Sequence, residues 1–241
     1  MPIFMRTFVQ IAAIALFVAA TAFNIAAVAA DPGWLIVPAV VAGWFFADMA
    51  SGLVHMYMDY RPCPEGKGLA ALYFYQGSRA SEGYRTRFAE AMRGLSPVER
   101  LAYDFKNHHP RPDALGRRDM WRQIGSTLLL GTLPGALILA LAVVFTDIPG
   151  WLTAGFISLQ IGSTFAQYFH GSLHRDDNPP PVRALRRIGL LMSPAAHRKH
   201  HATLDRDFAT NCGWSNAFLN PVFRWALRRG LLTTQGLEPP A

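Results

Sequence analysis

Four long apolar runs constrain the fold of this chain more than any other feature. They cover Phe8–Ala30, Trp34–Met58, Ile124–Phe145 and Trp151–His170. Each is close to the ~20 residues that an α-helix needs to cross the hydrocarbon core of a bilayer, where a backbone must satisfy its own hydrogen bonds. Charged residues make up only 16% of the 241 residues, against ~25% in an average globular domain. We therefore predict an all-α, multi-pass membrane protein with about four transmembrane helices.

Short polar turns join these runs in pairs. Asp31-Pro32-Gly33 joins the first two and Thr146–Gly150 joins the last two, and both turns contain helix-breaking residues. Neither turn contains Lys or Arg, whereas Arg61–Arg122 holds twelve of the 23 basic residues and the chain after His170 holds ten. The positive-inside rule then predicts that both termini and the long middle segment are cytosolic.

The first run has an alternative interpretation. Arg6, the apolar stretch and Ala27-Val28-Ala29-Ala30 resemble a signal peptide with its cleavage site. Its apolar stretch exceeds the ~7–15 residues of a signal-peptide core, so we favour an uncleaved transmembrane helix. The second run crosses in the same direction in either case.

The distribution of the basic residues argues against a nucleic-acid-binding protein, and the number of cysteines argues against a disulfide-stabilised one. The net charge is +7, but the basic residues follow the apolar runs, and no basic block with interleaved aromatics indicates nucleic-acid binding. Cys63 and Cys212 are too few for a disulfide framework. Both lie in segments predicted to be cytosolic, where thiols stay reduced.

The eight histidines fall into four compact groups with none left over. The groups are His55 with Asp59, His108-His109, His170 with His174, and His197 with His200-His201. On continuing helices, residues separated by three or four positions share one face. The sequence therefore predicts that each group presents its side chains together, as metal sites in helical bundles do.

The four groups are predicted to meet in one layer. At ~1.5 Å per residue, a helix from Trp34 reaches His55, and one from Trp151 reaches His170, after about one membrane thickness. The other two groups lie in segments predicted to be cytosolic. We therefore expect a histidine-rich helical cap just inside the cytosolic boundary of the bilayer.

The number of donors indicates two metals. A structural zinc takes about four ligands and a catalytic zinc about three plus water, so eight imidazoles and the Asp59 carboxylate exceed the needs of one ion. Iron is the metal whose open His and carboxylate sites activate oxygen. The His-Glu-x-x-His motif of zinc proteases is absent from the sequence, and a haem would use only one or two of the histidines.

Four polar residues near these groups are candidates for supporting roles. Asp48 and Ser51 lie on the His55 face of the second run, where they could orient imidazoles, carry protons or bond to a neighbouring helix. Asn107 precedes the paired histidines and Gln167 precedes His170. These two could support the ligands or lie at a polar helix interface.

The motifs resemble those of the plasmanylethanolamine desaturase family, which includes the Kua proteins and the plant desaturases of phosphatidylglycerol palmitate. The similar segments are Ala47–His55 with Asp59, His108–Pro112 with Arg118-Asp119, Gln167–His174, Ser193–His201 and Asn211–Asn216. The resemblance extends from Gly43 to Pro221. The chain departs from the family in its long stretch Arg61–Tyr103 and in Ala196, where some members carry another histidine.

The resemblance implies three segments. Residues 1–33 form the first transmembrane helix and turn, residues 34–221 the lipid desaturase domain, and residues 222–241 a cytosolic tail. It also implies that the eight histidines and Asp59 hold two iron ions.

The implied activity is an O2-dependent desaturation of a membrane phospholipid. A site at the bilayer boundary meets a chain near its glycerol end, which fits conversion of a 1-O-alkyl ether to a vinyl ether. Electrons would come from an external carrier, because no dinucleotide fingerprint is present in the sequence, and a basic face would attract an acidic ferredoxin or cytochrome b5. The alternatives are an acyl desaturase or hydroxylase on the same scaffold, and a non-enzymatic metal- or haem-binding membrane protein.

Overall fold

The predicted all-α fold is confirmed over the part of the chain that the structure describes. This computed structural model describes residues 3–61, 68–73, 75–234 and 237. All the regular elements among them are helices. Three of these helices are long and apolar enough to cross a membrane, namely those covering Thr7–Ala30, Ile36–Tyr60 and Met120–Phe145. The chain is thus a membrane protein by the length and composition of its helices.

The centre of the fold is a close pair of long helices, α2 (Ile36–Tyr60) and α9 (Gly150–Ser172). A Cβ on Gly43 would lie 2.1 Å from the Gly155 carbonyl oxygen, and one on Gly162 would lie 2.6 Å from the Ala47 Cβ. Small residues therefore let the two backbones approach, as in membrane helix pairs. α9 carries several polar side chains and is not among the three apolar spans, so its crossing of the bilayer stays a prediction.

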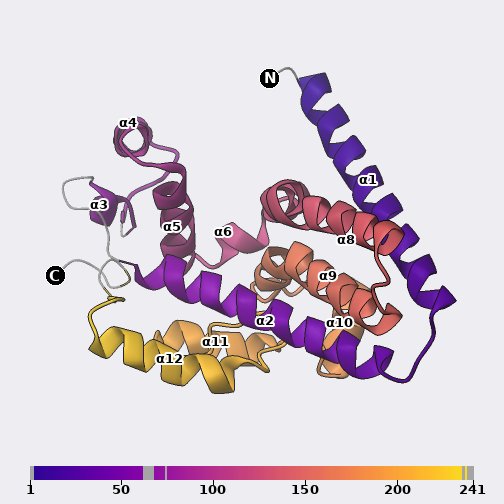
Figure 1. Ribbon diagram of the computed structural model, residues 1–241. Coiled ribbons are helices and arrows are strands. Elements are labelled where there is room, and N and C mark those ends of the chain that lie inside the picture. Colours follow the sequence, from indigo (N-terminus) through magenta and orange to yellow (C-terminus); the bar gives the residue numbers. More distant parts are fainter. Residues whose placement is uncertain (1–2, 62–67, 74, 235–236, 238–241) are drawn as a thin grey trace.

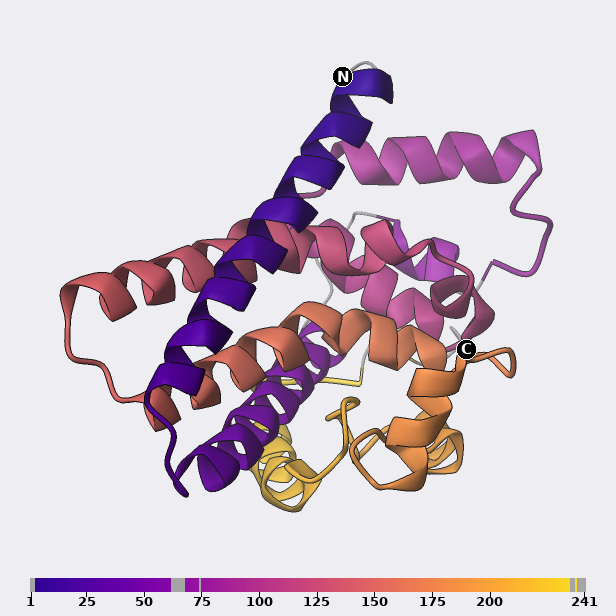
Figure 2. The ribbon, with the colours of Figure 1, turned by 90° about the vertical axis from the view of Figure 1, so that its right-hand side faces the viewer.

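Helix α1 (Ile3–Ala30) crosses over α8 (Leu133–Phe145) and α9 (Figure 2). The buried Asn24 side chain donates to the Ala136 carbonyl at 3.1 Å. The Gly150 backbone N–H donates to the Asp31 carboxylate at 2.7 Å. The two polar turns predicted to lie on one side of the membrane are therefore in contact.

The third apolar run begins earlier than predicted and is not a uniform α-helix. It consists of α7 (Met120–Thr127), a π-helical turn η1 (Leu128–Thr132) and α8. The Asp119 side chain accepts a hydrogen bond from the Arg122 N–H at 3.0 Å, which caps the helix four residues before the predicted start at Ile124. Pro134 lies in the first turn of α8, where its missing N–H is tolerated.

The polar helices gather at the end of α2 that carries His55. α3 (Leu69–Tyr73), α4 (Glu82–Arg93), α5 (Pro97–His108) and α6 (Asp113–Gly116) lie around this end, and α11 (Pro194–Thr203) and α12 (Asn216–Arg228) lie along the opposite flank of α2 (Figure 1). α10 (Pro180–Arg187) connects α9 to α11. A capping box of Ser96 and Glu99 starts α5, and this start fixes the helix that ends at the paired histidines.

Helix α12 and the two cysteines bear on two further predictions. The predicted boundary between residues 221 and 222 lies inside α12, which continues through Pro221 to Arg228, and the extent of the desaturase domain stays a prediction. Cys63 lies outside the described residues, whereas Cys212 is a free thiol. Burial and the nearby Asp48 carboxylate raise the pKa of the Cys212 thiol to about 12.

Candidate metal centre

All eight histidines and Asp59 come together at one place in the fold. α2 supplies His55 and Asp59, and the end of α5 supplies His108 with its C-cap His109. The end of α9 supplies His170, and the buried face of α11 supplies His197 and His200 with His201 beside them. The convergence predicted from topology is therefore present, although metal binding by these residues stays a prediction.

His174 reaches the cluster differently from the prediction. We expected it one turn after His170 on a continuing helix, but α9 ends at Ser172 and His174 lies in the following turn. The Asn178 side chain donates to the carbonyls of Ser172 and Arg175 at 2.9 and 2.6 Å. This amide takes carbonyl acceptors at the end of the helix and so favours the turn.

One ligand group surrounds the Nε2 atom of His197. The Nε2 atoms of His170, His174 and His201 each lie 3.1 Å from it. A neutral imidazole nitrogen is either one donor or one acceptor, so three such contacts cannot all be hydrogen bonds. Nitrogens about 2.1 Å from one metal lie roughly 3 Å apart when they meet it at right angles, which matches this spacing.

A second ligand group surrounds the buried carboxylate of Asp59. Its Oδ2 atom lies 2.6 Å from Nε2 of His109, 2.9 Å from Nε2 of His55 and 3.7 Å from Nε2 of His200. Its Oδ1 atom is buried without a hydrogen-bond partner. A carboxylate with an unused oxygen among three imidazoles is the donor set of a mixed nitrogen and oxygen metal site.

The two groups are adjacent. His108 offers a ligand atom within 4.8 Å of those of His170, His174, His197 and His201, and within the same distance of those of His55, Asp59 and His109. The ring centroids of His55 and His170, one from each group, are 4.6 Å apart. The two ligand groups therefore lie next to each other rather than at separate places in the fold.

Backbone carbonyls fix the orientation of three of the imidazoles. Nδ1 of His55 donates to the Phe208 carbonyl at 2.8 Å, Nδ1 of His200 to the Arg206 carbonyl at 2.7 Å, and Nδ1 of His108 to the Phe105 carbonyl. The Nε2 atoms of the same three rings are buried and make no hydrogen bond. Metal-binding histidines show this pattern, in which the outer nitrogen is anchored and the inner lone pair faces the ion.

Burial keeps several imidazoles of the cluster neutral. It lowers the pKa of His200 to about 4 and the pKa of His201 to about 2. The pKa values of His108 and His197 are also well below the ordinary value, mainly through burial. The neutral imidazole is the form that binds a metal, so the donor set of this cluster fits metal ions.

The four supporting candidates take different places. The Asp48 carboxylate accepts hydrogen bonds from Cys212 N, Gly213 N, and Ser215 N and Oγ, at 2.7–2.9 Å. It thus holds the loop after Phe208, not an imidazole. Ser51 Oγ donates to the Asp48 carbonyl at 2.7 Å, and the Asn107 Oδ1 accepts from Arg79 at 2.6 Å.

Three further contributors were not predicted from the sequence. The carbonyls of Phe208 and Arg206 act through the backbone, so their residue types give no signal. Lys106 is also buried at the cluster, where its ammonium donates to the Asp59 backbone carbonyl. Its position two residues before His108 was the signal available for it.

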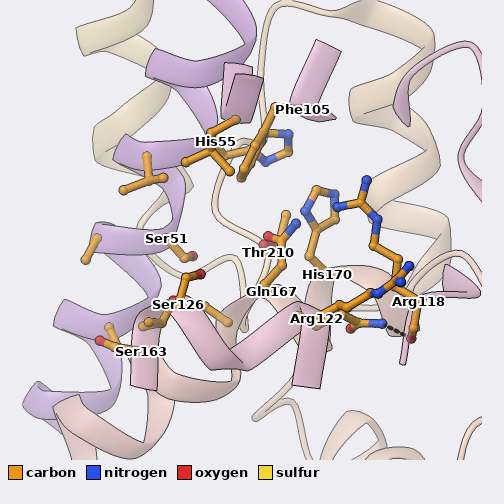
Figure 3. A pocket seen from close by; sticks show the side chains of 17 residues that line it. Ser51, His55, Phe105, Arg118, Arg122, Ser126, Ser163, Gln167, His170 and Thr210 are labelled. Carbon is orange, nitrogen blue, oxygen red and sulfur yellow. Dashed lines mark hydrogen bonds between the residues drawn. The ribbon is translucent and has the colours of Figure 1, made fainter. Parts of the chain in front are cut away.

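A cavity of about 230 Å³ opens beside the cluster (Figure 3). His55 and His170 form part of its wall, and Gln167, the fourth supporting candidate, also lines it. Much of the remaining lining is apolar, including Ala47, Val54, Leu101, Phe105 and Ala166. The cavity therefore joins both ligand groups to a space suited to an alkyl chain.

These features define a helical membrane protein with a buried, histidine-rich site for metal ions. Residues 99–240 match the family model of the lipid desaturase domain. The chain therefore belongs to the lipid desaturase domain family, which confirms the resemblance found in its motifs.

The chain is also 29% identical over 210 residues to the plasmanylethanolamine desaturase of Myxococcus xanthus. That alignment covers 86% of this chain and 64% of the relative, so the chain spans less than two thirds of the relative's length. No solved structure matches the chain.

Proposed function

We propose that this chain is an oxidoreductase that desaturates membrane lipids with O2 at a di-iron centre. The substrate is a plasmanyl phospholipid, whose 1-O-alkyl chain becomes the vinyl ether of a plasmalogen. The observation that carries the proposal is the junction of two adjacent ligand groups with one apolar cavity. The name of the Myxococcus xanthus relative supports this choice of substrate.

Each ligand group would hold one iron. His170, His174, His197 and His201 form one set, and His55, Asp59, His109 and His200 form the other, with His108 between them. Bound iron supplies the activation of O2 that removal of two hydrogen atoms from adjacent carbons requires. The chain's own contribution is to hold the imidazoles in fixed orientations, through the backbone carbonyls that anchor the outer nitrogens of His55, His108 and His200.

The cavity wall would position the alkyl chain and exclude water. Phe105 packs near both His55 and His170, with ring centroid distances of 5.8 and 6.4 Å. An apolar wall at this point places hydrocarbon, rather than water, beside the ligands. The reacting carbons would therefore lie close to the lipid head group, at the depth where α2 and α9 reach the cluster.

The membrane arrangement is part of the same proposal. α1, α2, the α7–η1–α8 segment and α9 would form four spans, with the histidine site and both termini on the cytosolic side. The desaturase domain would extend over residues 34–221, because α2 supplies His55 and Asp59 although the family match begins at residue 99. The contact between Asp31 and Gly150 supports the placement of both polar turns on the opposite side.

Reducing electrons would come from an external acidic carrier, such as a ferredoxin or cytochrome b5. Arg198 and Lys199 are exposed on α11, between the buried His197 and His200. A negatively charged carrier docked there would lie next to the ligands, and the opposite charges would steer its approach.

A lipid profile tests this proposal. The chain is expressed in a host without plasmalogens that is fed 1-O-alkylglycerol, and acid-labile vinyl ethers are measured by mass spectrometry. We expect vinyl ethers with the parent chain and none with His55→Ala or His200→Ala. A new acyl double bond or hydroxyl instead would indicate an acyl desaturase or hydroxylase. An unchanged lipid profile with folded protein and a supplied electron carrier would favour the non-enzymatic metal- or haem-binding alternative.

A further inference from the structure

The cavity beside the histidine cluster has an apolar part and a basic part in its lining. Ala50, Val54 and Leu101 form an exposed apolar rim, with Val54 48% and Leu101 43% exposed. Val54 belongs to a helix that is long and apolar enough to span the membrane. This rim therefore gives a hydrocarbon chain a path from the bilayer into the cavity.

The basic part of the lining lies beside His170. Arg118 and Arg122 line the cavity on the His170 side, whereas Ser126 and Ser163 lie toward the other end (Figure 3). None of the described residues that line this cavity is acidic. Arg118 and Arg122 thus place two positive charges in the lining, next to the wall formed by His55 and His170.

The ion pairs of these arginines leave donors for a ligand. Arg118 contacts the Asp104 carboxylate through both terminal nitrogens, at 3.3 and 3.4 Å, and Arg122 contacts Asp119 through Nε at 3.3 Å. Both aspartates lie outside the cavity lining, and their carboxylates are 41% and 60% exposed. A guanidinium has five N–H donors, and partly exposed pairs of this kind contribute little to stability. A phosphate can therefore bind both arginines without breaking a buried ion pair.

We propose that Arg118 and Arg122 bind the phosphate of a glycerophospholipid substrate and so set the position of its sn-1 chain at the metal cluster. This inference rests on the proposed function and makes its substrate class narrower. Guanidinium groups suit phosphate because they form paired, charge-assisted hydrogen bonds. In a glycerophospholipid only a few covalent bonds separate the phosphate from the first carbons of the sn-1 chain. Binding of the phosphate on the His170 side therefore places those carbons at the wall formed by His55 and His170.

Lipid binding to the purified full-length chain tests this directly. The probes are a 1-O-alkyl-2-acyl-glycerophosphoethanolamine and the matching 1-O-alkyl-2-acylglycerol, which lacks the phosphate. Thermal stabilisation is measured without O2 or an electron carrier for the parent, Arg122→Gln, Arg118→Lys and Arg118→Gln. The control Arg224→Gln removes an exposed charge from α12, which does not line the cavity.

We expect the parent to bind the phospholipid more tightly than the neutral lipid. Arg122→Gln and Arg118→Gln should weaken phospholipid binding about tenfold or more while leaving the neutral lipid unaffected, and Arg118→Lys should keep part of the preference. Equal losses in Arg122→Gln and Arg224→Gln would overturn the proposal, because they would show a general surface charge effect. A parent without preference for the phosphate would also overturn it.

Activity then separates this inference from the proposed function. In an active enzyme, Arg122→Gln should raise KM for the phospholipid with little change in kcat. If the chain desaturates lipids without any preference for the phosphate, only the proposal that Arg118 and Arg122 bind phosphate is overturned. A chain that binds the phospholipid through the arginines but desaturates nothing would overturn only the proposed function.

Discussion

The Asp48 carboxylate on α2 accepts two hydrogen bonds from Ser215, one from the backbone N–H at 2.9 Å and one from Oγ at 2.7 Å. The two residues are 167 positions apart in the chain. Between them the loop passes Phe208, whose carbonyl anchors the Nδ1 atom of His55. Asp48 therefore connects α2, which carries His55, to the segment that orients this histidine.

Replacing Asp48 with Asn should loosen this loop while keeping the size of the side chain. An amide has one acceptor oxygen in place of two, so buried N–H groups lose their partners at a cost of about 1–3 kcal/mol. We expect metal affinity to fall about 10–100-fold, as for other residues that support ligands. Metal titration of purified Asp48→Asn checks this. Ser215→Ala, which removes one of the four hydrogen bonds, should have a smaller effect, and parent-like affinity in Asp48→Asn would refute the connection.

His197 should be essential to one metal and not to the fold. Its Nε2 atom lies within 3.1 Å of three other ligand nitrogens, so His197→Ala removes the centre of that group. We expect this variant to lose about one metal equivalent and its desaturation activity. The control is Lys199→Ala, an exposed position on the same helix, which should keep its metal. Equal metal contents in the two variants would contradict this assignment of the ligands.

Gly52 should tolerate no side chain. A Cβ at this position would lie 2.3 Å from the Leu219 Cδ1 and 2.9 Å from the Ala209 backbone, directly after Phe208. We expect Gly52→Ala to lower the free energy of unfolding by about 1–3 kcal/mol through overpacking and to reduce metal content. Gly131→Ala is the control, because a Cβ there meets nothing within 4 Å. Thermal unfolding of both variants in detergent compares them, and equal stability would argue against the close contact.

Filling the cavity should stop the reaction without removing the metal. Ala166 lines the cavity one turn before His170, so Ala166→Leu would occupy space meant for the lipid chain. We expect at least a tenfold loss of activity with unchanged metal content, measured on the same preparation. Ala42→Leu adds the same volume at an exposed position of α2 outside the cavity lining and should stay active. If Ala166→Leu is as active as this control, the cavity does not bind the substrate.

The sequence predicted much of the site because its signals are local. The spacing of His55 and Asp59, and of His197, His200 and His201, is helical, and these residues do lie on helices. His174 differs because α9 ends before it, where the Asn178 side chain donates to the Ser172 and Arg175 carbonyls, and the spacing of the histidines gives no signal for this end. The carbonyl partners of the imidazoles had no signal in residue types, since every residue carries a carbonyl.

Asp48 shows a second limit of local patterns. The spacing of Asp48 and His55 places them on one helix face and predicts a role for Asp48 beside the imidazole. The hydrogen-bond partners of Asp48 instead lie in a loop far along the chain. Helical periodicity carries no information about such contacts. The predicted fourth span, α9, shows a similar limit. α9 packs along α2 through glycines, and its polar residues make it less apolar than the other three long segments.

The metal content of the purified parent chain is the most direct test of the proposed di-iron centre. Elemental analysis after expression with iron, together with an absorption spectrum, gives both the identity and the number of bound ions. We expect about two iron ions per chain and no haem absorption. One metal or fewer per folded chain, zinc in place of iron, or a haem spectrum would contradict it.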